Sequence, residues 1–424
     1  MNLDTLHKLF LECNSVNTDT RNIKEGDLFF ALKGENFNGN TYAQQAIEKG
    51  AKYAVIDEKS FESDNTILVK DTLETLQNLA TSHRKYLKTK IIALTGSNGK
   101  TTTKELINVV LSKKFNTTAT KGNLNNHIGV PLTLLSMTEE TEIGIIEMGA
   151  NHQKEIEFLC NIALPDYGLI TNYGKAHLEG FGGLEGVIKG KSEMFVHLIK
   201  NNKTIFLNTN DPIQIKKSKE GKVFTFGKSE KNPKVAINFI NARPFVKLKY
   251  NDTTINSQLI GNYNFNNIAV AVAIGNYFEV SDMDIKYAIE GYVPSNNRSQ
   301  IIEDGNLKII LDAYNANPTS MRAALLNFEK QDGYKIAILG DMFELGTAAK
   351  LEHQTITDLA VYLNIDKIYL VGKNFFNSNT NSSKVNQFET FNSFNKSISL
   401  KDTHNSIILI KGSRGMALER FLDN

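Results

Sequence analysis

Short apolar runs recur along this chain, each followed by a glycine-bearing or polar turn and often by a stretch with helical periodicity. In the middle of the chain, four such runs occupy residues 91–94, 143–146, 168–171 and 204–207. Uninterrupted apolar runs of this length are typical of strands that are covered on both faces of a sheet. The alternation therefore predicts an α/β fold, with a largely parallel sheet and helices on both of its faces.

The same alternation extends toward both ends of the chain. Before the middle part, it predicts strands at residues 27–32 and 51–56 and helices at residues 42–49 and 72–87. After the middle part, the predicted strands are residues 307–311, 335–339, 367–371 and 406–410. We predict three domains, because 424 residues exceed the size of one hydrophobic core. They are a small N-terminal α/β domain at residues 1–88, a central P-loop ATPase-type domain at 89–296 and a C-terminal Rossmann-like domain at 297–424.

Two polar segments interrupt these elements. Residues 294–298 (Pro-Ser-Asn-Asn-Arg) are predicted to form a hinge between the second and third domains. Proline keeps the preceding residue out of a helix, and the remaining residues favour turns. Residues 377–387 are polar enough to predict a solvated loop, to which we assign no function.

A glycine loop lies between the apolar run 91–94 and the helical stretch that follows it. Successive backbone N–H groups in such a loop, together with a helix N-terminus, form a concave site for anions. Lys100 can reach terminal phosphates there, and the Thr101 hydroxyl can hold Mg²⁺. The general phosphate-loop pattern has a first glycine where this chain has Leu94, and Gly-Lys-Thr also occurs in surface turns. The flanking strand and helix favour a nucleoside triphosphate site.

Two residues near the expected position of this loop are candidates for metal chemistry. Glu147 directly follows the buried-type strand 143–146, so its carboxylate must be paired or metal-bound to offset desolvation. His177 follows strand 168–171 in a polar loop, where a neutral imidazole can bind a metal. A lone histidine is more often an ordinary surface residue, and the local pattern leaves both interpretations open.

Lys191 lies on the apolar face of a helix predicted at residues 184–199. It comes four residues after Val187 and four residues before Phe195. Burial disfavours the charged form of an amine, so an inward-pointing Lys191 would be partly neutral and nucleophilic. The alternative is a lysine whose methylenes are covered while its ammonium reaches solvent, and the helix pattern alone does not decide between them.

Composition and charge are those of an ordinary globular protein. Apolar residues make up 41% of the chain and charged residues 22%, and a net charge of +2 gives no reason to propose nucleic acid or an anionic membrane as a partner. Cys13 and Cys160 form neither a disulfide framework nor a metal-ligand spacing, so we expect reduced thiols. The N-terminus does not resemble a signal peptide, and no apolar run approaches the roughly 18 residues of a membrane span. We therefore expect a cytoplasmic protein without a membrane span.

Several longer motifs give the chain a family resemblance. Together they resemble the ATP-dependent Mur ligases of bacterial cell-wall synthesis, and the resemblance spans nearly the whole chain. The motifs lie at residues 96–102, 122–131, 147–150, 172–177, 191–193, 261–267, 297–298, 312–318 and 411–414. Within the family, the branch that adds D-alanyl-D-alanine is most similar at residues 19–21, 26–31, 312–318 and 340–346. The Asp-Asn-Pro-Arg signature of the branch that adds diaminopimelate or lysine is missing.

The resemblance implies an ATP site shared by the second and third domains. In such a site, Lys100 and the loop amides would hold the ATP phosphates, and Arg298 would contact them as well. Asn267 would contact adenine, and Asp312 would contact the ribose. The implied ATP-binding residues are Gly96, Ser97, Asn98, Gly99, Lys100, Thr101, Thr102, Asn267, Arg298 and Asp312. Because these residues belong to two domains, the resemblance also implies closure about the hinge at residues 294–298.

The resemblance implies two Mg²⁺ sites as well. Thr101 and Glu147 would hold one ion, and His177 and Lys191 would serve the second. Lys191 would be N-carboxylated, because carbon dioxide adds only to an uncharged amine and a carbamate supplies the anionic oxygens that a hard cation prefers. This implication favours the inward-pointing reading of Lys191. Lys100, Glu147, His177 and Lys191 are the implied catalytic residues.

The implied reaction joins D-alanyl-D-alanine to UDP-N-acetylmuramoyl-tripeptide through an acyl phosphate, for peptidoglycan synthesis and hence cell shape and division. Thr20 and Arg21 would lie near the UDP of the substrate, and Asn125 and Asn126 near its muramoyl peptide. Asn40 stands where this branch often has histidine, so the uridine contacts of the first domain are left open. Other implied substrate-binding residues are Asn315, Asn317, Lys411, Ser413 and Arg414, the last three as candidates for carboxylate recognition. We expect a monomer.

Three alternatives stay open at this point. Another amide ligase of the superfamily, either an amino-acid-adding Mur ligase or a folylpolyglutamate or cyanophycin-type synthetase, would keep the ATP site and change the first domain. A switch GTPase would need a guanine-reading Asn-Lys-x-Asp motif after a later strand, which residues 172–175 do not supply. A non-catalytic nucleotide-binding scaffold is disfavoured by the presence of all four implied catalytic residues.

Overall fold

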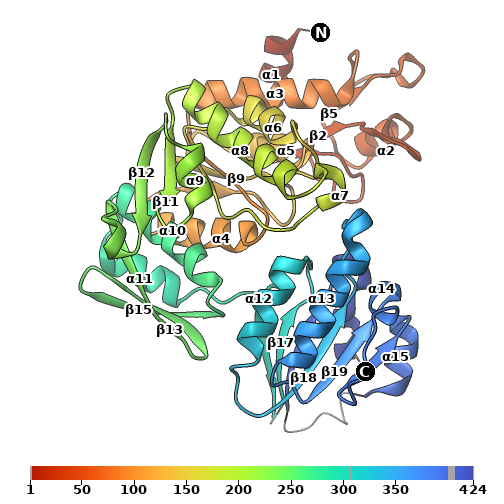
Figure 1. Cartoon of the computed structure of the whole chain (residues 1–424). Coiled ribbons are helices and arrows are strands. Elements are labelled where there is room, and N and C mark those ends of the chain that lie inside the picture. Colours follow the sequence, from red (N-terminus) through yellow and green to blue (C-terminus); the bar gives the residue numbers. More distant parts are fainter. Residues whose placement is uncertain (1, 296, 306, 400–405, 424) are drawn as a thin grey trace.

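The computed structural model describes residues 2–295, 297–305, 307–399 and 406–423. Figure 1 shows three α/β parts in chain order, coloured from red through green to blue, each with helices packed on a sheet. The third part, in blue, lies apart from the first and faces the central one. The structure confirms the predicted α/β class and the three-domain architecture, whereas the limits at residues 88 and 296 stay a prediction.

The first domain contains a parallel sheet of four strands in the order β1-β2-β5-β6. Its strands are β1 (Val16–Asn17), β2 (Leu28–Phe30), β5 (Tyr53–Ile56) and β6 (Thr66–Leu68), and a small hairpin joins β3 (Lys33–Gly34) to β4 (Phe37–Asn38). Its helices are α1 (Leu3–Leu11), α2 (Ala43–Glu48) and α3 (Thr72–Leu87). Helix α3 has the predicted bounds, because the Asp71 side chain caps it by accepting from the Glu74 N–H and Lys88 ends it with φ of 56°.

The central domain is built on nine strands in the order β15-β14-β13-β12-β11-β10-β7-β9-β8. The strands are β7 (Lys90–Thr95), β8 (Thr117–Ala119), β9 (Ile143–Glu147), β10 (Tyr167–Ile170), β11 (Thr204–Asn208), β12 (Lys222–Gly227), β13 (Val235–Ala242), β14 (Phe245–Tyr250) and β15 (Thr253–Ile260). The helices are α4 (Lys100–Leu111), α5 (Gly129–Leu135), α6 (Glu155–Ala163), α7 (Leu178–Phe181), α8 (Leu184–Lys200), α9 (Pro212–Lys217), α10 (Asn264–Tyr277) and α11 (Asp282–Glu290).

Part of this sheet differs from the prediction. Strands β13, β14 and β15 pair antiparallel and extend one edge of an otherwise parallel sheet. In β14 and β15, buried residues alternate with more exposed ones, as expected for strands with one covered face. These strands lack the uninterrupted apolar runs by which the buried parallel strands were predicted. The antiparallel edge of the sheet was therefore not predicted from the sequence.

The third domain has six strands in the order β16-β17-β21-β18-β19-β20. The strands are β16 (Gln300–Asp304), β17 (Leu307–Asp312), β18 (Tyr334–Gly340), β19 (Lys367–Val371), β20 (Val385–Phe388) and β21 (Ser406–Lys411). The helices are α12 (Pro318–Phe328), α13 (Ala349–Tyr362), α14 (Lys373–Phe376) and α15 (Phe391–Ser397). The predicted loop 377–387 is wrong at its end, because Val385 begins strand β20, which pairs with β19.

Packing fixes the first domain on the second. Buried side chains of α1 and α3 belong to the same hydrophobic cluster as those of α5, α6 and α8, and α3 packs against both α5 and α6. Burial of such a continuous apolar surface is the main stabilising contribution between two packed units. The third domain is built on two further hydrophobic clusters. One of them includes Ile260 of the central domain, with Leu178 and Phe245 packed against it, and the polar contacts described below also join the two domains.

Candidate active site

The glycine loop joins the end of β7 to the first turn of α4. Gly96 has φ of 146° and Gly99 has φ of 79°, in the region that side chains other than hydrogen rarely adopt. A Cβ on Gly99 would lie 2.5 Å from Oδ1 of Asn267. The backbone can thus curl tightly ahead of the helix N-terminus, which leaves the amides of this segment around a space that an anion can occupy.

Replacing Gly99 by alanine tests this cradle. We expect the Michaelis constant for ATP to rise about tenfold or more, because the strain of a positive φ and the contact with Asn267 together amount to about 1–3 kcal/mol. Gly333→Ala is the matched control, since Gly333 has φ of 103° but nothing within 4 Å of the added Cβ. Steady-state kinetics and thermal unfolding of both variants are the measurement. Equal ATP constants in the two variants would contradict a role of the loop in nucleotide binding.

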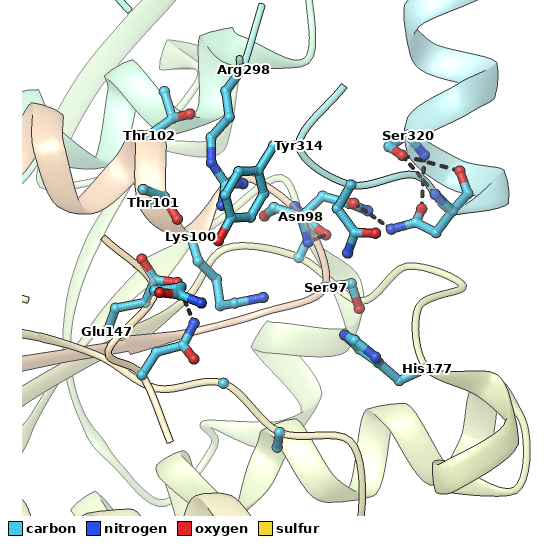
Figure 2. Close-up of a pocket in the computed structure, with 18 of the residues that line it drawn as sticks. Ser97, Asn98, Lys100, Thr101, Thr102, Glu147, His177, Arg298, Tyr314 and Ser320 are labelled. Atoms are coloured by element: carbon cyan, nitrogen blue, oxygen red, sulfur yellow. Dashed lines mark hydrogen bonds between the residues drawn. The ribbon is translucent and has the colours of Figure 1, made fainter. Parts of the chain in front are cut away.

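Lys100 and the two threonines after it lie at the N-terminus of α4. The Lys100 ammonium donates to the carbonyl oxygen of Gly96 at 2.8 Å. Burial lowers the pKa of Lys100; the Glu147 carboxylate opposes this shift and Arg298 adds to it. Thr101 and Thr102 are buried beside it. Figure 2 shows Lys100 directed into the space between Glu147 and His177.

Glu147 ends β9, which lies next to β7 with Glu147 opposite Leu94. Its side chain is 1% exposed. The Oε1 atom accepts from Nδ2 of Asn125 at 2.8 Å, whereas Oε2 is buried and has no hydrogen-bond partner within the described part of the chain. A buried carboxylate oxygen without a donor is costly, so this atom is suited to a cation beside the phosphate loop.

His177 lies in the loop after β10, in a left-handed conformation with φ of 53°. Its Nδ1 atom lies 2.5 Å from Oε2 of Glu344 in the third domain, a contact that is an ion pair only when the imidazole is protonated. The contact with His177 lowers the pKa of Glu344. An imidazole at the cavity wall is thus held from behind by a carboxylate of another domain.

Lys191 points inward from α8, which decides between the two readings of its position. It is 1% exposed, its ammonium donates to the carbonyl oxygen of Ala150 at 3.0 Å, and it lies 5.1 Å from the ring centre of Phe181. Burial lowers the pKa of Lys191 well below its ordinary value, and the neighbouring Lys100 charge adds to the shift. Burial therefore favours the neutral amine, which is the form that reacts with carbon dioxide.

The third domain contributes a second group of polar side chains. The Arg298 guanidinium lies 3.7 Å from the ring centre of Tyr314, and its buried Nε has no hydrogen-bond partner among the residues that the structure describes. Oδ2 of Asp312 accepts from the Lys411 ammonium at 2.6 Å, and Oδ1 accepts from the Ser299 N–H at 3.2 Å. Asp312 is thus paired with Lys411 inside the site, beside the stacked arginine.

Both domains line one cavity of about 610 Å³. Nδ2 of Asn317, which caps α12, donates to Oδ1 of Asn98 in the glycine loop at 2.7 Å and so joins the two walls (Figure 2). The sequence-predicted residues that line the cavity are Ser97, Asn98, Gly99, Lys100, Thr101, Thr102, Asn125, Asn126, Glu147, His177, Asn267, Arg298, Asp312, Asn315, Asn317 and Lys411. The cavity is large enough for a nucleotide and the reacting end of a second substrate.

Two of these lining residues already use their side-chain amides in hydrogen bonds within the protein. Oδ1 of Asn267 accepts from the Thr103 hydroxyl and its Nδ2 donates to Asn264, below the glycine loop. Oδ1 of Asn126 accepts from the N–H groups of Ile128 and Gly129, at the start of α5. Their implied contacts to adenine and to the muramoyl peptide stay predictions.

The remaining predicted residues do not line this cavity. Lys191 lies one layer behind the wall that Ala150 forms. Ser413 accepts from the Phe343 N–H at 3.0 Å, and Arg414 pairs with Glu419. Thr20 lies in the first domain, as does Arg21, which pairs with Asp19 and is 85% exposed in its side chain. Their roles toward substrate stay predictions.

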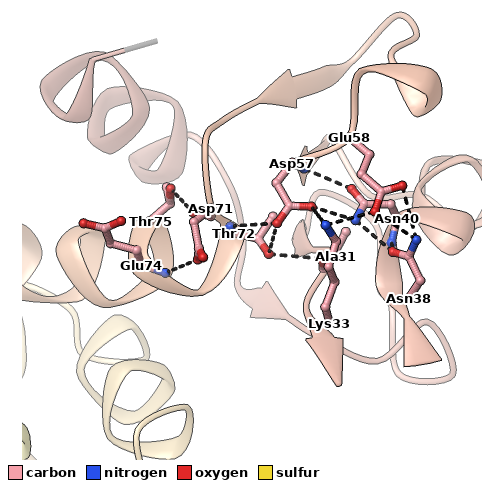
Figure 3. A network of polar contacts seen from close by, with 10 residues as sticks. All are labelled: Ala31, Lys33, Asn38, Asn40, Asp57, Glu58, Asp71, Thr72, Glu74 and Thr75. Carbon is pink, nitrogen blue, oxygen red and sulfur yellow. Dashed lines mark hydrogen bonds and ion pairs between the residues drawn. The ribbon is translucent and has the colours of Figure 1, made fainter. Parts of the chain in front are cut away.

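Figure 3 shows what Asn40 does in the first domain. Asn40 is completely buried, and its Nδ2 donates to Asn38 and to Asp57, whose N–H donates back to Oδ1 of Asn40. Lys33 pairs with Asp57 and with Glu58 in the same network. At the position where the related branch often has histidine, this chain thus has a residue that ties the hairpin to the end of β5.

Sequence reasoning missed several residues of the site. Tyr314, which stacks on Arg298, and Glu344, which contacts His177, lie in the motifs at residues 312–318 and 340–346, but their partners come from distant segments. Lys175 pairs with Glu352 of α13 at 2.5 Å across the same interface. These pairs join residues that are distant in the sequence, so they become visible only in the folded structure.

A strand, a glycine loop and a helix face an unpaired buried carboxylate, and a second domain lies over the same cavity. This arrangement defines the class of nucleotide-using enzymes. Family models agree with this class. The models match residues 12–84 (Mur ligase family, catalytic domain), 94–275 (Mur ligase middle domain) and 297–414 (Mur ligase, glutamate ligase domain). The chain belongs to the Mur ligase family.

Curated relatives and solved structures show which members of the family the chain is similar to. The chain is 34% identical over 422 residues to the UDP-N-acetylmuramoyl-tripeptide--D-alanyl-D-alanine ligase of Bacillus subtilis, with 96% of this chain and 92% of that protein covered. It is 33% identical to the enzyme of the same name from Escherichia coli, with the same coverage. MurF from Acinetobacter baumannii has a similar structure, with a TM-score of 0.87 at 29% identity over 100% of this chain and 98% of that one. MurF from Thermotoga maritima in complex with ADP has a TM-score of 0.85 at 26% identity, over 98% and 97% of the two chains.

Within the described ranges, none of the helices combines the length and the apolar character that crossing a membrane requires.

Proposed function

We propose that this protein is the ATP-dependent ligase that adds D-alanyl-D-alanine to UDP-N-acetylmuramoyl-tripeptide, and so makes the UDP-muramoyl-pentapeptide of peptidoglycan synthesis. The observation that carries the proposal is the cavity where the glycine loop, the unpaired oxygen of Glu147 and the Arg298–Tyr314 pair meet. The curated relatives named for this reaction support the choice of substrates, and the ADP-bound relative from Thermotoga maritima supports the nucleotide.

The first step is phosphoryl transfer from ATP to the terminal carboxylate of the tripeptide. A carboxylate oxygen bonds to the γ-phosphorus, the bond to the ADP oxygen breaks, and the products are an acyl phosphate and ADP. The Lys100 ammonium and the loop amides neutralise charge on the phosphates, and the Arg298 guanidinium is placed to do the same from the third domain. Most catalysis of such transfers comes from positioning and charge stabilisation.

The donor groups present suit Mg²⁺. Among the described residues, no group of three or more His, Cys, Asp or Glu side chains could hold a metal ion. Mg²⁺ commonly takes one or two carboxylates together with substrate phosphates and water, so Glu147, the Thr101 hydroxyl and the ATP oxygens would suffice for one ion. When bound, Mg²⁺ would neutralise charge on the transferring phosphoryl group. We assign the second ion to His177 and to Lys191 as a carbamate, for which the support is the burial of the Lys191 amine, since burial lowers its pKa.

In the second step, the amine of D-alanyl-D-alanine attacks the acyl carbon, phosphate leaves, and a proton is lost to form the amide. No side chain in the cavity stands out as the base. Water would hydrolyse the acyl phosphate, so the site has to be covered by both domains during reaction. The bond between Asn98 and Asn317 holds the third domain over the loop in this way.

The finer assignments belong to the same proposal. We place Thr20 and Arg21 near the UDP group, and Lys411, Ser413 and Arg414 near a substrate carboxylate. A monomer that works in the cytoplasm is the simplest arrangement, because each chain carries both walls of the cavity and ATP is a cytoplasmic substrate. A place in cell-wall synthesis ties the reaction to cell shape and division.

The test is a direct ligation assay. Purified protein is incubated with ATP, Mg²⁺, UDP-N-acetylmuramoyl-tripeptide and D-alanyl-D-alanine, and mass spectrometry follows the nucleotide-linked peptide. We expect the pentapeptide product, with ADP and phosphate formed in equal amounts. Single amino acids, including glutamate, serve as competing amines. Extension by one of them in place of the dipeptide would assign another amide ligase of the family, and no product with any amine would overturn the proposal.

A further inference from the structure

We propose that Glu344 of the third domain is a positioning residue, which holds the His177 imidazole toward the shared cavity only while the third domain is docked. The inference rests on the proposed function, because that function gives His177 its role. Its direct observation is the 2.5 Å contact between Nδ1 of His177 and Oε2 of Glu344. The two residues belong to different domains, and neither reaches the other without domain contact.

The loop that carries His177 depends on the third domain for its shape. His177 itself has φ of 53°, an uncommon conformation for a residue with a side chain. The Lys175 N–H donates to the Thr319 hydroxyl at 3.0 Å, and the Glu179 N–H donates to the carbonyl oxygen of Glu344 at 3.3 Å. The third domain therefore contacts this segment on both sides of its strained residue, through Thr319 before His177 and through the Glu344 carbonyl after it, while the Glu344 carboxylate contacts His177 itself.

Glu344 is presented by a loop that is itself held firmly. The Met342 N–H donates to Nε2 of the buried His353 at 3.0 Å, and the Phe343 N–H donates to Oγ of Ser413 at 3.0 Å. These bonds fix the two residues before Glu344 on the third domain. When that domain moves, Glu344 thus moves with it as part of a rigid support.

A carboxylate behind an imidazole selects the tautomer and fixes the ring. With Nδ1 facing Glu344, Nε2 is the nitrogen left for the cavity, where Figure 2 shows the His177 ring directed toward Ser97. Removing such a supporting carboxylate commonly lowers metal affinity or activity about 10- to 100-fold. Docking of the third domain would thus complete the site at the moment when water is excluded.

The kinetic test compares three variants. Glu344→Ala should lower kcat about 10- to 100-fold with a smaller change in the ATP Michaelis constant, because orientation rather than nucleotide binding is lost. Glu344→Gln keeps an oxygen that can accept from Nδ1 and should restore most of kcat. Glu352→Gln is the matched control, since it removes the ion pair to Lys175 across the same interface without touching His177, and should change kcat less than about fivefold. An equal loss in Glu352→Gln and Glu344→Ala would overturn the proposal in favour of a general role in domain contact.

A second readout does not need turnover. Nitrogen-15 spectra of the imidazoles tell which ring nitrogen carries the proton, and His177→Gln assigns the His177 signals among the eight histidines. With ADP bound, the wild-type protein should show His177 protonated on Nδ1, and Glu344→Ala should show a mixture of tautomers. Unchanged His177 signals in Glu344→Ala would overturn the proposal. Because this readout is independent of ligation, failure of the proposed reaction would be recognised separately.

Discussion

Replacing Lys100 by alanine is expected to lower kcat about 100- to 1000-fold, because the ammonium is the protein's own positive charge closest to the phosphate cradle. The side chain reaches back over the loop to Gly96 and is directed into the cavity (Figure 2). A charge placed there before ATP arrives needs little reorganisation when negative charge moves onto the transferring phosphoryl oxygens. Single-turnover measurement of ADP formation with all substrates present checks this expectation.

The loss should leave the fold intact. Burial lowers the pKa of Lys100, which means that the folded protein holds this ammonium at a cost in free energy. Lys100→Met keeps the apolar stem and removes the charge, so its melting temperature should equal or exceed that of the wild type while kcat falls as in the alanine variant. A Lys100→Met enzyme with wild-type turnover would contradict the assignment of Lys100 to the phosphates.

How far the sequence predicts this fold depends on the kind of strand. The buried parallel strands were predicted within one or two residues, because a strand covered on both faces needs an uninterrupted apolar run, as at residues 143–146 of β9. The antiparallel strands from Val235 to Ile260 were not, because one face of each is exposed and the apolar signal is divided by polar residues. A strand that is covered on one face has apolar residues at alternate positions only, which is a weaker signal than an uninterrupted apolar run.

For the site, local chemistry and motifs led to the residues whose neighbours are fixed by one strand and one loop. Lys100, Glu147 and Arg298 line the shared cavity, and the roles assigned to them stay predictions. Contacts between domains could not be predicted in this way. Glu344 is 167 residues from His177 in the chain, and its carboxylate contacts the imidazole only because the two domains pack together. The helix pattern put Lys191 on the apolar face of α8 without deciding where its ammonium lies, and only its 1% exposure in the structure removed the alternative of an exposed ammonium.

Replacing Lys191 by alanine should abolish most of the ligation, with kcat at least about 100-fold lower, because the carbamate oxygens proposed for the second ion disappear. The wild-type amine is ready for carboxylation, since burial and the nearby Lys100 charge lower its pKa and leave more of it neutral. The same lowered pKa predicts how carboxylation depends on pH. Because the pKa of Lys191 is lowered, the neutral amine that binds carbon dioxide persists to lower pH, and carboxylation should be lost only below that pKa. Carbon-13 bicarbonate should therefore give a carbamate signal in the wild type that Lys191→Ala lacks.

A short carboxylic acid provides the deciding control for this variant. The alanine substitution opens space next to Phe181 and Ala150, and formate or acetate added there would return a carboxylate to the place of the carbamate. We expect about tenfold recovery of kcat in Lys191→Ala and none in Lys100→Ala, because the anion replaces oxygens and not an ammonium. Full activity of Lys191→Ala without any added acid would remove the carbamate from the mechanism, and recovery in both variants would mean that the anion acts on something other than the missing side chain.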